Sequence, residues 1–310
     1  MRTAFLFPGQ GAQSPGYLHR LPARELVHRT LEEASSVLEL DCTRMDGETA
    51  LESTVAVQLG TLIAGVAYAR LLAAEQALPD AVAGLSVGAF AAAVASGALE
   101  FKDALELVRL RSTAMEVRFG RGDFGMLAVL GLAETELRVL IEKTASVTMP
   151  LHLASVNAPH EMVVAGSEAA LGAVSQTVQG AGARAQRLKV SVPSHGPLLD
   201  DVSAELRKAM RAVHLEPPRV PYVGGYRARA LTRADDVAED LVLNVSRMVR
   251  WHESVTLLYE LGCRLFVEMP PGRALSGLVR QEFPEARAAA AVDVDAPSIV
   301  HLVRRAAGSV

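Results

Sequence analysis

The hydrophobic and polar positions of the first 120 residues predict strands that alternate with helices. Residues 3–7 form a β-rich apolar run, and the Pro-Gly-Gln-Gly at 8–11 then predicts a buried strand followed by a tight loop. A second short strand is expected at 81–83, directly after the helix-breaking Pro79-Asp80. Helical spacing of apolar residues predicts helices at about 23–40, 54–75, 89–96 and 101–119.

The pattern changes between residues 125 and 192, where only short strands and short helices fit. The predicted order is βαββαβ, which is the ferredoxin-like pattern. The elements are strand 126–130, helix 134–144, strands 152–156 and 161–165, helix 169–179 and strand 185–190. We therefore expect residues 125–190 to form a small ferredoxin-like domain, inserted into a larger domain made from residues 1–124 and 191–310.

The pattern of the larger domain resumes after Pro193. It predicts helices at about 197–212 and 248–261, a strand at 264–268 and a helix after Pro271-Gly272. Nearly continuous apolar strands that alternate with long helices are typical of a parallel sheet with helices on both faces. The expected fold class is therefore α/β.

Composition excludes several other classes of protein. The chain has 310 residues, of which 50% are hydrophobic and 21% charged, so it is not expected to be disordered. Its formal net charge of −4 argues against nucleic-acid binding, which needs clustered positive charge. Cys42 and Cys263 are too few for a disulfide scaffold or a zinc site, and we expect both to be buried.

One segment, residues 81–99, carries no charge and is long enough to cross a membrane. It is rich in Ala, Gly and Ser, however, and Gly84, Gly88 and Gly97 would weaken a helix. Pro8 stops the apolar run near the N-terminus before it reaches the length of a secretory signal. The sequence therefore predicts a cytoplasmic protein with no membrane segment.

The strongest chemical motif is the G-x-S-x-G at residues 84–88, centred on Ser86. The predicted strand before it and helix after it are the context of a nucleophile elbow. Glycines suit such a turn because a side chain would collide with the neighbouring backbone, and the serine then sits where free helix N–H groups can receive an oxyanion. The alternative is a glycine-rich helix start with Ser86 as a simple N-cap.

A serine nucleophile needs a base within hydrogen-bond reach. Among the eight histidines, His195 stands out because residues 191–197 would place it on a rigid turn directly after a strand. No aspartate completes a triad, so an amide or a backbone carbonyl would have to orient the imidazole. Five others lie in helical or charged surroundings and are expected to be bystanders: His19, His28, His214, His252 and His301.

Six motifs, in this order, resemble those of the malonyl-CoA:acyl carrier protein transacylases, and they span nearly the whole chain. They are Phe7-Pro8-Gly9-Gln10-Gly11-Ala12-Gln13, the motif at 84–88, Leu110-Arg111 with Met115, Val190 to His195, Val249-Arg250-Trp251 and Glu268 to Gly272. The resemblance implies an α/β-hydrolase-like large domain and a ferredoxin-like small domain. It also implies malonyl-CoA and a small acyl carrier protein as partners, with no bound cofactor and no metal.

The resemblance assigns a role to each matching position. Ser86 would form a malonyl ester with His195 as its general base, while Gln10 and Val87 would supply the N–H groups of an oxyanion hole. Arg111 would bind the free carboxylate of the malonyl group, since a guanidinium can hold a carboxylate through two hydrogen bonds.

Three further polar residues carry weaker expectations. Asn157 matches a family position near the substrate, although an Asn-Ala-Pro turn is reason enough for an asparagine. Asn244 matches the position that orients the histidine, where the family usually has Gln. Arg109 lies on another face of its helix than Arg111 and is expected to be solvated or structural.

The elbow departs from the usual Gly-His-Ser-Leu-Gly-Glu of the family at Leu85 and Ala89. In this it resembles the epsilon subunit of malonate decarboxylase, which loads malonyl onto a carrier subunit that bears a phosphoribosyl-dephospho-CoA arm. That subunit is the leading functional hypothesis. The alternatives are a malonyl-CoA:acyl carrier protein transacylase of fatty-acid or polyketide synthesis, a serine thioesterase or other hydrolase, and a non-catalytic scaffold subunit.

Overall fold

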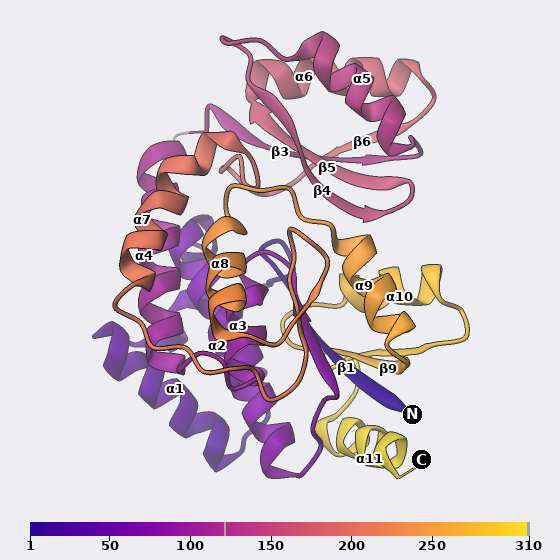
Figure 1. Cartoon of the computed structure of the whole chain (residues 1–310). Coiled ribbons are helices and arrows are strands. Elements are labelled where there is room, and N and C mark those ends of the chain that lie inside the picture. Colours follow the sequence, from indigo (N-terminus) through magenta and orange to yellow (C-terminus); the bar gives the residue numbers. More distant parts are fainter. Residues whose placement is uncertain (121, 309–310) are drawn as a thin grey trace.

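The computed structural model describes residues 1–120 and 122–308 and contains two β-sheets (Figure 1). The larger sheet has the strand order β10-β9-β1-β2-β7-β8, and all neighbours are parallel except β7 and β8. Its strands are β1 (Arg2–Phe7), β2 (Ala81–Gly84), β7 (Tyr222–Val223), β8 (Ala230–Leu231), β9 (Cys263–Glu268) and β10 (Arg287–Ala290). The predicted α/β class is therefore confirmed.

Helices cover both faces of this sheet, as the apolar strands predict. Side chains of β1 alternate between two cores, with Phe5 and Phe7 in the first and Ala4 and Leu6 in the second. The first core includes α1 (Glu25–Leu38), α2 (Thr54–Ala74), α3 (Gly88–Ala95), α4 (Phe101–Phe119), α7 (Asp200–Met210), α8 (Ala234–Leu243) and α11 (Ala296–Ala307). The second core includes α9 (Trp251–Glu260) and α10 (Ala274–Glu282).

The smaller sheet is antiparallel, with the order β4-β5-β3-β6, and lies at one end of the molecule (Figure 1). Its elements follow the predicted βαββαβ order. They are β3 (Phe124–Leu130), α5 (Glu134–Thr144), β4 (Leu151–Ala158), β5 (Glu161–Ser167), α6 (Glu168–Gly180) and β6 (Arg184–Arg187). Both helices pack on one face through an apolar core of their own, so the other face is turned toward the larger unit (Figure 1).

The predicted strand at 185–190 is too long, since β6 ends at Arg187. The guanidinium of Arg187 donates to the carbonyls of Phe124 and Met126, which are acceptors on the neighbouring strand β3. The N–H of Leu188 also donates to the Met126 carbonyl, but residues 188–196 run as a loop. His195 therefore does not directly follow a strand as the sequence predicts.

A backbone seam joins the smaller sheet to the larger unit. The N–H of Val156 donates to the Val249 carbonyl at 2.9 Å, and the N–H of Val249 donates to the Ala154 carbonyl at 2.9 Å. Strand β4 is thus tied to the segment that leads into α9.

The charge-free run at 81–99 folds as strand β2, a turn, helix α3 and the loop after it, which confirms that it is no membrane helix. Among the described helices, α2 alone is long and apolar enough to span a membrane, but 83% of its most apolar window is buried inside the protein. Cys42 and Cys263 are both buried and unbridged, as expected.

Candidate active site

The turn between β2 and α3 has the geometry of a nucleophile elbow. Ser86 has a φ of 54°, in the left-handed region that L-residues rarely occupy. A Cβ on Gly84 would lie 2.2 Å from the backbone of Gly88, and one on Gly88 would lie 2.2 Å from the carbonyl oxygen of Phe7. The glycines are therefore required by close backbone approach. Val87, not Ser86, is the N-cap of α3, so the simple capping alternative is wrong.

Two backbone N–H groups beside the elbow are unused. Within the described chain, neither Gln10 nor Val87 donates a backbone hydrogen bond. The loop that carries Gln10 approaches the elbow closely, since a Cβ on Gly9 would lie 2.9 Å from the Leu85 carbonyl oxygen. Val87 opens α3, where the helix dipole favours negative charge. This pair of donors can receive an anionic oxygen.

Arg111, on α4, is a buried cation beside the serine. Its side chain is 1% exposed, and its Nη2 donates to Ser86 Oγ at 3.1 Å. Nη1 donates to the Gln58 Oε1 at 2.7 Å, while Nε has no partner among the described residues. Burial lowers the pKa of Arg111 to about 10, so it remains charged at neutral pH. No acidic side chain of the described chain pairs with Arg111.

Gln58, on α2, belongs to this site although the sequence analysis misses it. Its side chain is 1% exposed and orients Arg111. An amide near the start of a helix whose neighbours are nearly all apolar is the signal that could have indicated it. Arg109, by contrast, pairs with Glu106 on the helix surface, which agrees with its expected structural role.

His195 is held by its backbone and by its ring. Its N–H donates to the Val245 carbonyl at 2.9 Å, and its Nδ1–H donates to the Asn244 carbonyl at 2.7 Å. Burial, and next the charge of Arg111, lower the pKa of His195 to about 3. The imidazole is therefore neutral at pH 7 with its proton on Nδ1, which leaves Nε2 free to accept a proton.

The two predicted asparagines take different positions. Asn244 contacts His195 through its backbone carbonyl, and its buried amide has no hydrogen-bond partner among the described residues. Asn157 lies on β4, half-buried, and its Oδ1 accepts a hydrogen bond from Ser155 Oγ at 2.6 Å.

A cavity of about 500 Å³ between the two sheets collects the site. Ser86, His195, Gln10, Gln58 and Asn157 all line it. Arg111, Val87 and Asn244 are not among its lining residues, but Arg111 contacts Ser86 and Asn244 contacts His195. No metal-ligand cluster occurs in the part of the chain that the structure describes.

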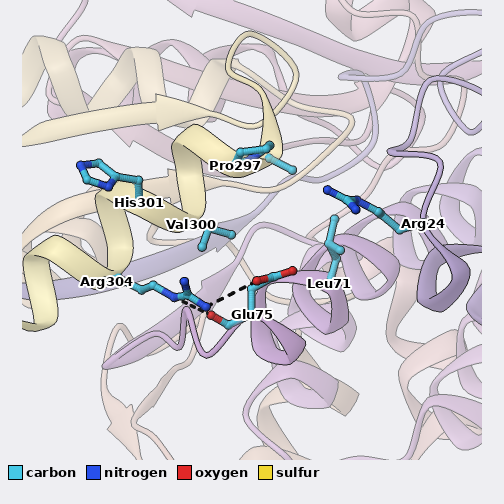
Figure 2. Close-up of a pocket in the computed structure, with 8 residues that line it drawn as sticks. Arg24, Leu71, Glu75, Pro297, Val300, His301 and Arg304 are labelled. Atoms are coloured by element: carbon cyan, nitrogen blue, oxygen red, sulfur yellow. Dashed lines mark hydrogen bonds and ion pairs between the residues drawn. The ribbon is translucent and has the colours of Figure 1, made fainter.

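A smaller cavity of about 320 Å³ lies apart from this site (Figure 2). Figure 2 shows Val300 and Arg304 of α11 facing Leu71 and Glu75 at the end of α2. The Arg304 guanidinium and the Glu75 carboxylate lie 3.4 Å apart and neutralise each other. Its lining contains no serine, cysteine or aspartate, and so offers no nucleophile–base pair.

A serine, a histidine and unused backbone N–H groups at the end of a parallel sheet are compatible with an acyl-transfer site. Three comparisons show the family of the chain. Residues 4–306 match the acyl transferase domain family. The chain is 32% identical over 288 residues to the malonyl CoA-acyl carrier protein transacylase of Bacillus subtilis, covering 90% of each chain. It therefore belongs to the acyl transferase family of malonyl-CoA:acyl carrier protein transacylases.

Solved structures of this family superpose on nearly the whole chain. The transacylase of Coxiella burnetii matches with a TM-score of 0.92 at 29% identity, covering 98% of both chains. A malonyl-transacylase solved with a type II polyketide acyl-carrier protein matches with a TM-score of 0.92 at 30% identity, covering 98% of this chain and 100% of that one. The predicted family is thus confirmed.

Proposed function

We propose that this enzyme transfers malonyl from malonyl-CoA to the thiol on the prosthetic arm of an acyl carrier protein. The observation that carries the proposal is the Arg111 guanidinium, which is buried beside Ser86 without a carboxylate partner. A buried cation is costly unless an anion pairs with it. The free carboxylate of a malonyl ester on Ser86 supplies that anion, whereas an acetyl ester does not.

The first half of the reaction acylates the enzyme. His195 Nε2 takes the proton from Ser86 Oγ as the oxygen attacks the thioester carbon of malonyl-CoA. The negative oxygen of the tetrahedral intermediate is received by the N–H groups of Gln10 and Val87, and one such donor is typically worth ~10²–10³ in rate. The C–S bond then breaks, and His195 returns the proton to the departing CoA thiolate.

The second half reverses these steps with a different thiol. The carrier thiol gives its proton to His195 Nε2 and attacks the malonyl ester, and Ser86 leaves as the hydroxyl. The Asn244 carbonyl, on Nδ1, keeps the imidazole in the same tautomer throughout. Asn157 would contact the acyl group from the opposite wall of the cavity.

The malonyl ester provides the direct test. Incubation with ¹⁴C-malonyl-CoA should label the folded protein on Ser86, as located by peptide mapping, and Ser86→Ala should remain unlabelled. An unlabelled wild-type protein would favour a scaffold subunit, and label that goes to water faster than to any carrier thiol would favour a thioesterase.

The acceptor decides the pathway. The relatives named above are transacylases, one of them solved with a polyketide carrier, which supports a carrier of fatty-acid or polyketide synthesis. Leu85 and Ala89 remain the reason to consider the epsilon subunit of malonate decarboxylase. We expect faster transfer to a carrier with a phosphopantetheine arm than to one with a phosphoribosyl-dephospho-CoA arm, and the reverse preference would indicate the decarboxylase.

The domain organisation is also a proposal. We infer an α/β-hydrolase-like domain of residues 1–124 and 191–310 and an inserted ferredoxin-like domain of residues 125–190. The separate apolar core of the smaller sheet supports this division. The enzyme is proposed to need no resident cofactor, and its location is predicted to be cytoplasmic.

A further inference from the structure

His152 lies on β4, outside the residues assigned above, and its ring contacts the turn that carries His195. Its Nε2 lies 3.1 Å from the carbonyl oxygen of Ser194. A carbonyl oxygen only accepts hydrogen bonds, so His152 Nε2 carries the proton of this bond. Burial lowers the pKa of His152, which keeps the ring neutral at pH 7.

The accepting carbonyl belongs to the peptide group that leads into His195. The other end of this planar group is the N–H of His195, which donates to the Val245 carbonyl at 2.9 Å. The peptide is thus held at both ends, by the smaller sheet on one side and by the segment after α8 on the other. His195 has a φ of 66°, a conformation that needs such support in an L-residue.

Gly196 provides an independent observation. Its φ of −157° is extended backbone that any residue can adopt. A Cβ at this position would nevertheless lie 2.0 Å from His152 Nε2. The glycine is therefore explained by the space that the imidazole of His152 occupies, and not by the conformation of the turn.

We infer that His152 is a positioning residue for His195. By fixing the Ser194–His195 peptide it keeps Nδ1 of His195 on the Asn244 carbonyl, 2.7 Å away, and leaves Nε2 free in the cavity beside Ser86. This inference rests on the proposed roles of Ser86 and His195. The smaller sheet would then do more than line the cavity, because through His152 it would also fix the orientation of the His195 imidazole.

The test compares variants in single-turnover acylation by ¹⁴C-malonyl-CoA. His152→Leu removes the donor and should lower the acylation rate constant about three- to tenfold, the typical effect of one neutral hydrogen bond. The KM for malonyl-CoA should stay unchanged, because His152 touches no substrate. His152→Gln places an amide N–H near the same point and should restore most of the rate.

His160→Leu is the matched control. His160 is exposed at the tip of the same β4–β5 hairpin, and its side chain makes no hydrogen bond with the described residues. Its replacement should leave the rate constant and the pH profile as in the wild-type protein.

The pH profile separates positioning from general structural support. The titratable and charged side chains that influence His195 are Arg111 and His152, and both lower its pKa, after burial. In His152→Leu the loosened turn admits water, which reduces the effect of burial, and the His152 ring is gone. Both changes raise the pKa of His195. The acid limb of the acylation rate should therefore move to higher pH in His152→Leu, and less in His152→Gln.

Three results would overturn the inference. The first is a wild-type rate and pH profile in His152→Leu. The second is a lower number of acylated sites with an unchanged rate constant, which would mean that His152 only supports folding. The third, for use if His152→Leu does not fold, is a wild-type rate in His152→Asn, whose shorter amide does not reach Ser194. Failure of wild-type acylation at Ser86 would refute the proposed function instead.

Discussion

At the scale of single residues, the chemistry of the site depends on one charge that the protein leaves without a counter-ion. Arg111 is held by an amide and a hydroxyl, both neutral. Gln58 orients the Arg111 guanidinium by a hydrogen bond but does not neutralise its charge. The proposed selectivity for a dicarboxylic acyl group would therefore depend on the absence of an acidic partner for Arg111 among the described residues.

Arg111→Ala should lower the preference for malonyl over acetyl transfer at least tenfold. A hydrogen bond to a charged group contributes about 1.5–3 kcal/mol. Malonyl loses this interaction with Arg111, whereas acetyl has no carboxylate and never makes it. Parallel kcat/KM measurements with malonyl-CoA and acetyl-CoA give the ratio. Arg109→Ala, which removes the neighbouring half-buried arginine, should leave the ratio unchanged. An equal loss for both acyl groups would mean that Arg111 serves only to support the fold.

At the scale of secondary-structure elements, β2, the elbow and α3 act as one unit whose spacing is set by backbone contact. A Cβ on Gly84 would collide with the backbone of Gly88, and a Cβ on Gly88 would collide with the backbone at the end of β1. Neither contact involves a flexible side chain, so an added methyl group has to move a strand or a helix.

Gly84→Ala should therefore destabilise the protein by about 1–3 kcal/mol and lower acylation of Ser86. Gly172→Ala is the control, because Gly172 lies inside α6 with open space around it and Ala is favoured there by about 0.5–1 kcal/mol. Urea unfolding measures both changes. Equal stability of the two variants would show that the elbow tolerates a side chain.

The elements that the sequence predicts are those with strong local signals. The helix at 134–144 is found with its observed bounds because its apolar spacing is regular. Strand β10 goes unpredicted, since Arg287–Ala290 is nearly all alanine and becomes a strand only by pairing with β9. Helix α11 also goes unpredicted, although Asp295 as N-cap and Pro297 in the first turn mark its start.

The same limit applies to the site. Ser86 and His195 stand in recognisable local motifs, whereas Gln58 and His152 act on residues 53 and 42 positions away. Such contacts depend on the packing of whole elements, and no local pattern specifies them. The strand order that brings β7 beside β2 is likewise a property of the complete sheet.

At the scale of the whole molecule, a buried carboxyl group makes the free energy of unfolding depend on pH. Asp240, on α8, is 1% exposed and accepts a hydrogen bond from the Tyr222 hydroxyl at 2.8 Å. Burial raises the pKa of Asp240 to about 6, so the folded state binds a proton more tightly than the unfolded state. The stability that this group contributes is present below its unfolded pKa and is lost as the pH rises through 6.

Asp240→Asn removes this titration. The free energy of unfolding, measured in urea at pH 5 and pH 8, should fall between these two pH values by about 1 kcal/mol more in the wild type than in the variant. Asp235→Asn, at an exposed position of the same helix, should behave as the wild type does. The same pH dependence in wild type and Asp240→Asn would show that the carboxyl group ionises normally.

The order of strands in the larger sheet has a consequence for synthesis on the ribosome. Strand β1 pairs with β2 on one side and with β9 on the other, and β9 begins at Cys263. The four strands and two helices of residues 124–187 are therefore translated before β9. They can associate while one edge of β1 is still unpaired. An open edge of apolar strand invites association with other chains, so we expect nascent chains to need protection until translation passes Glu268.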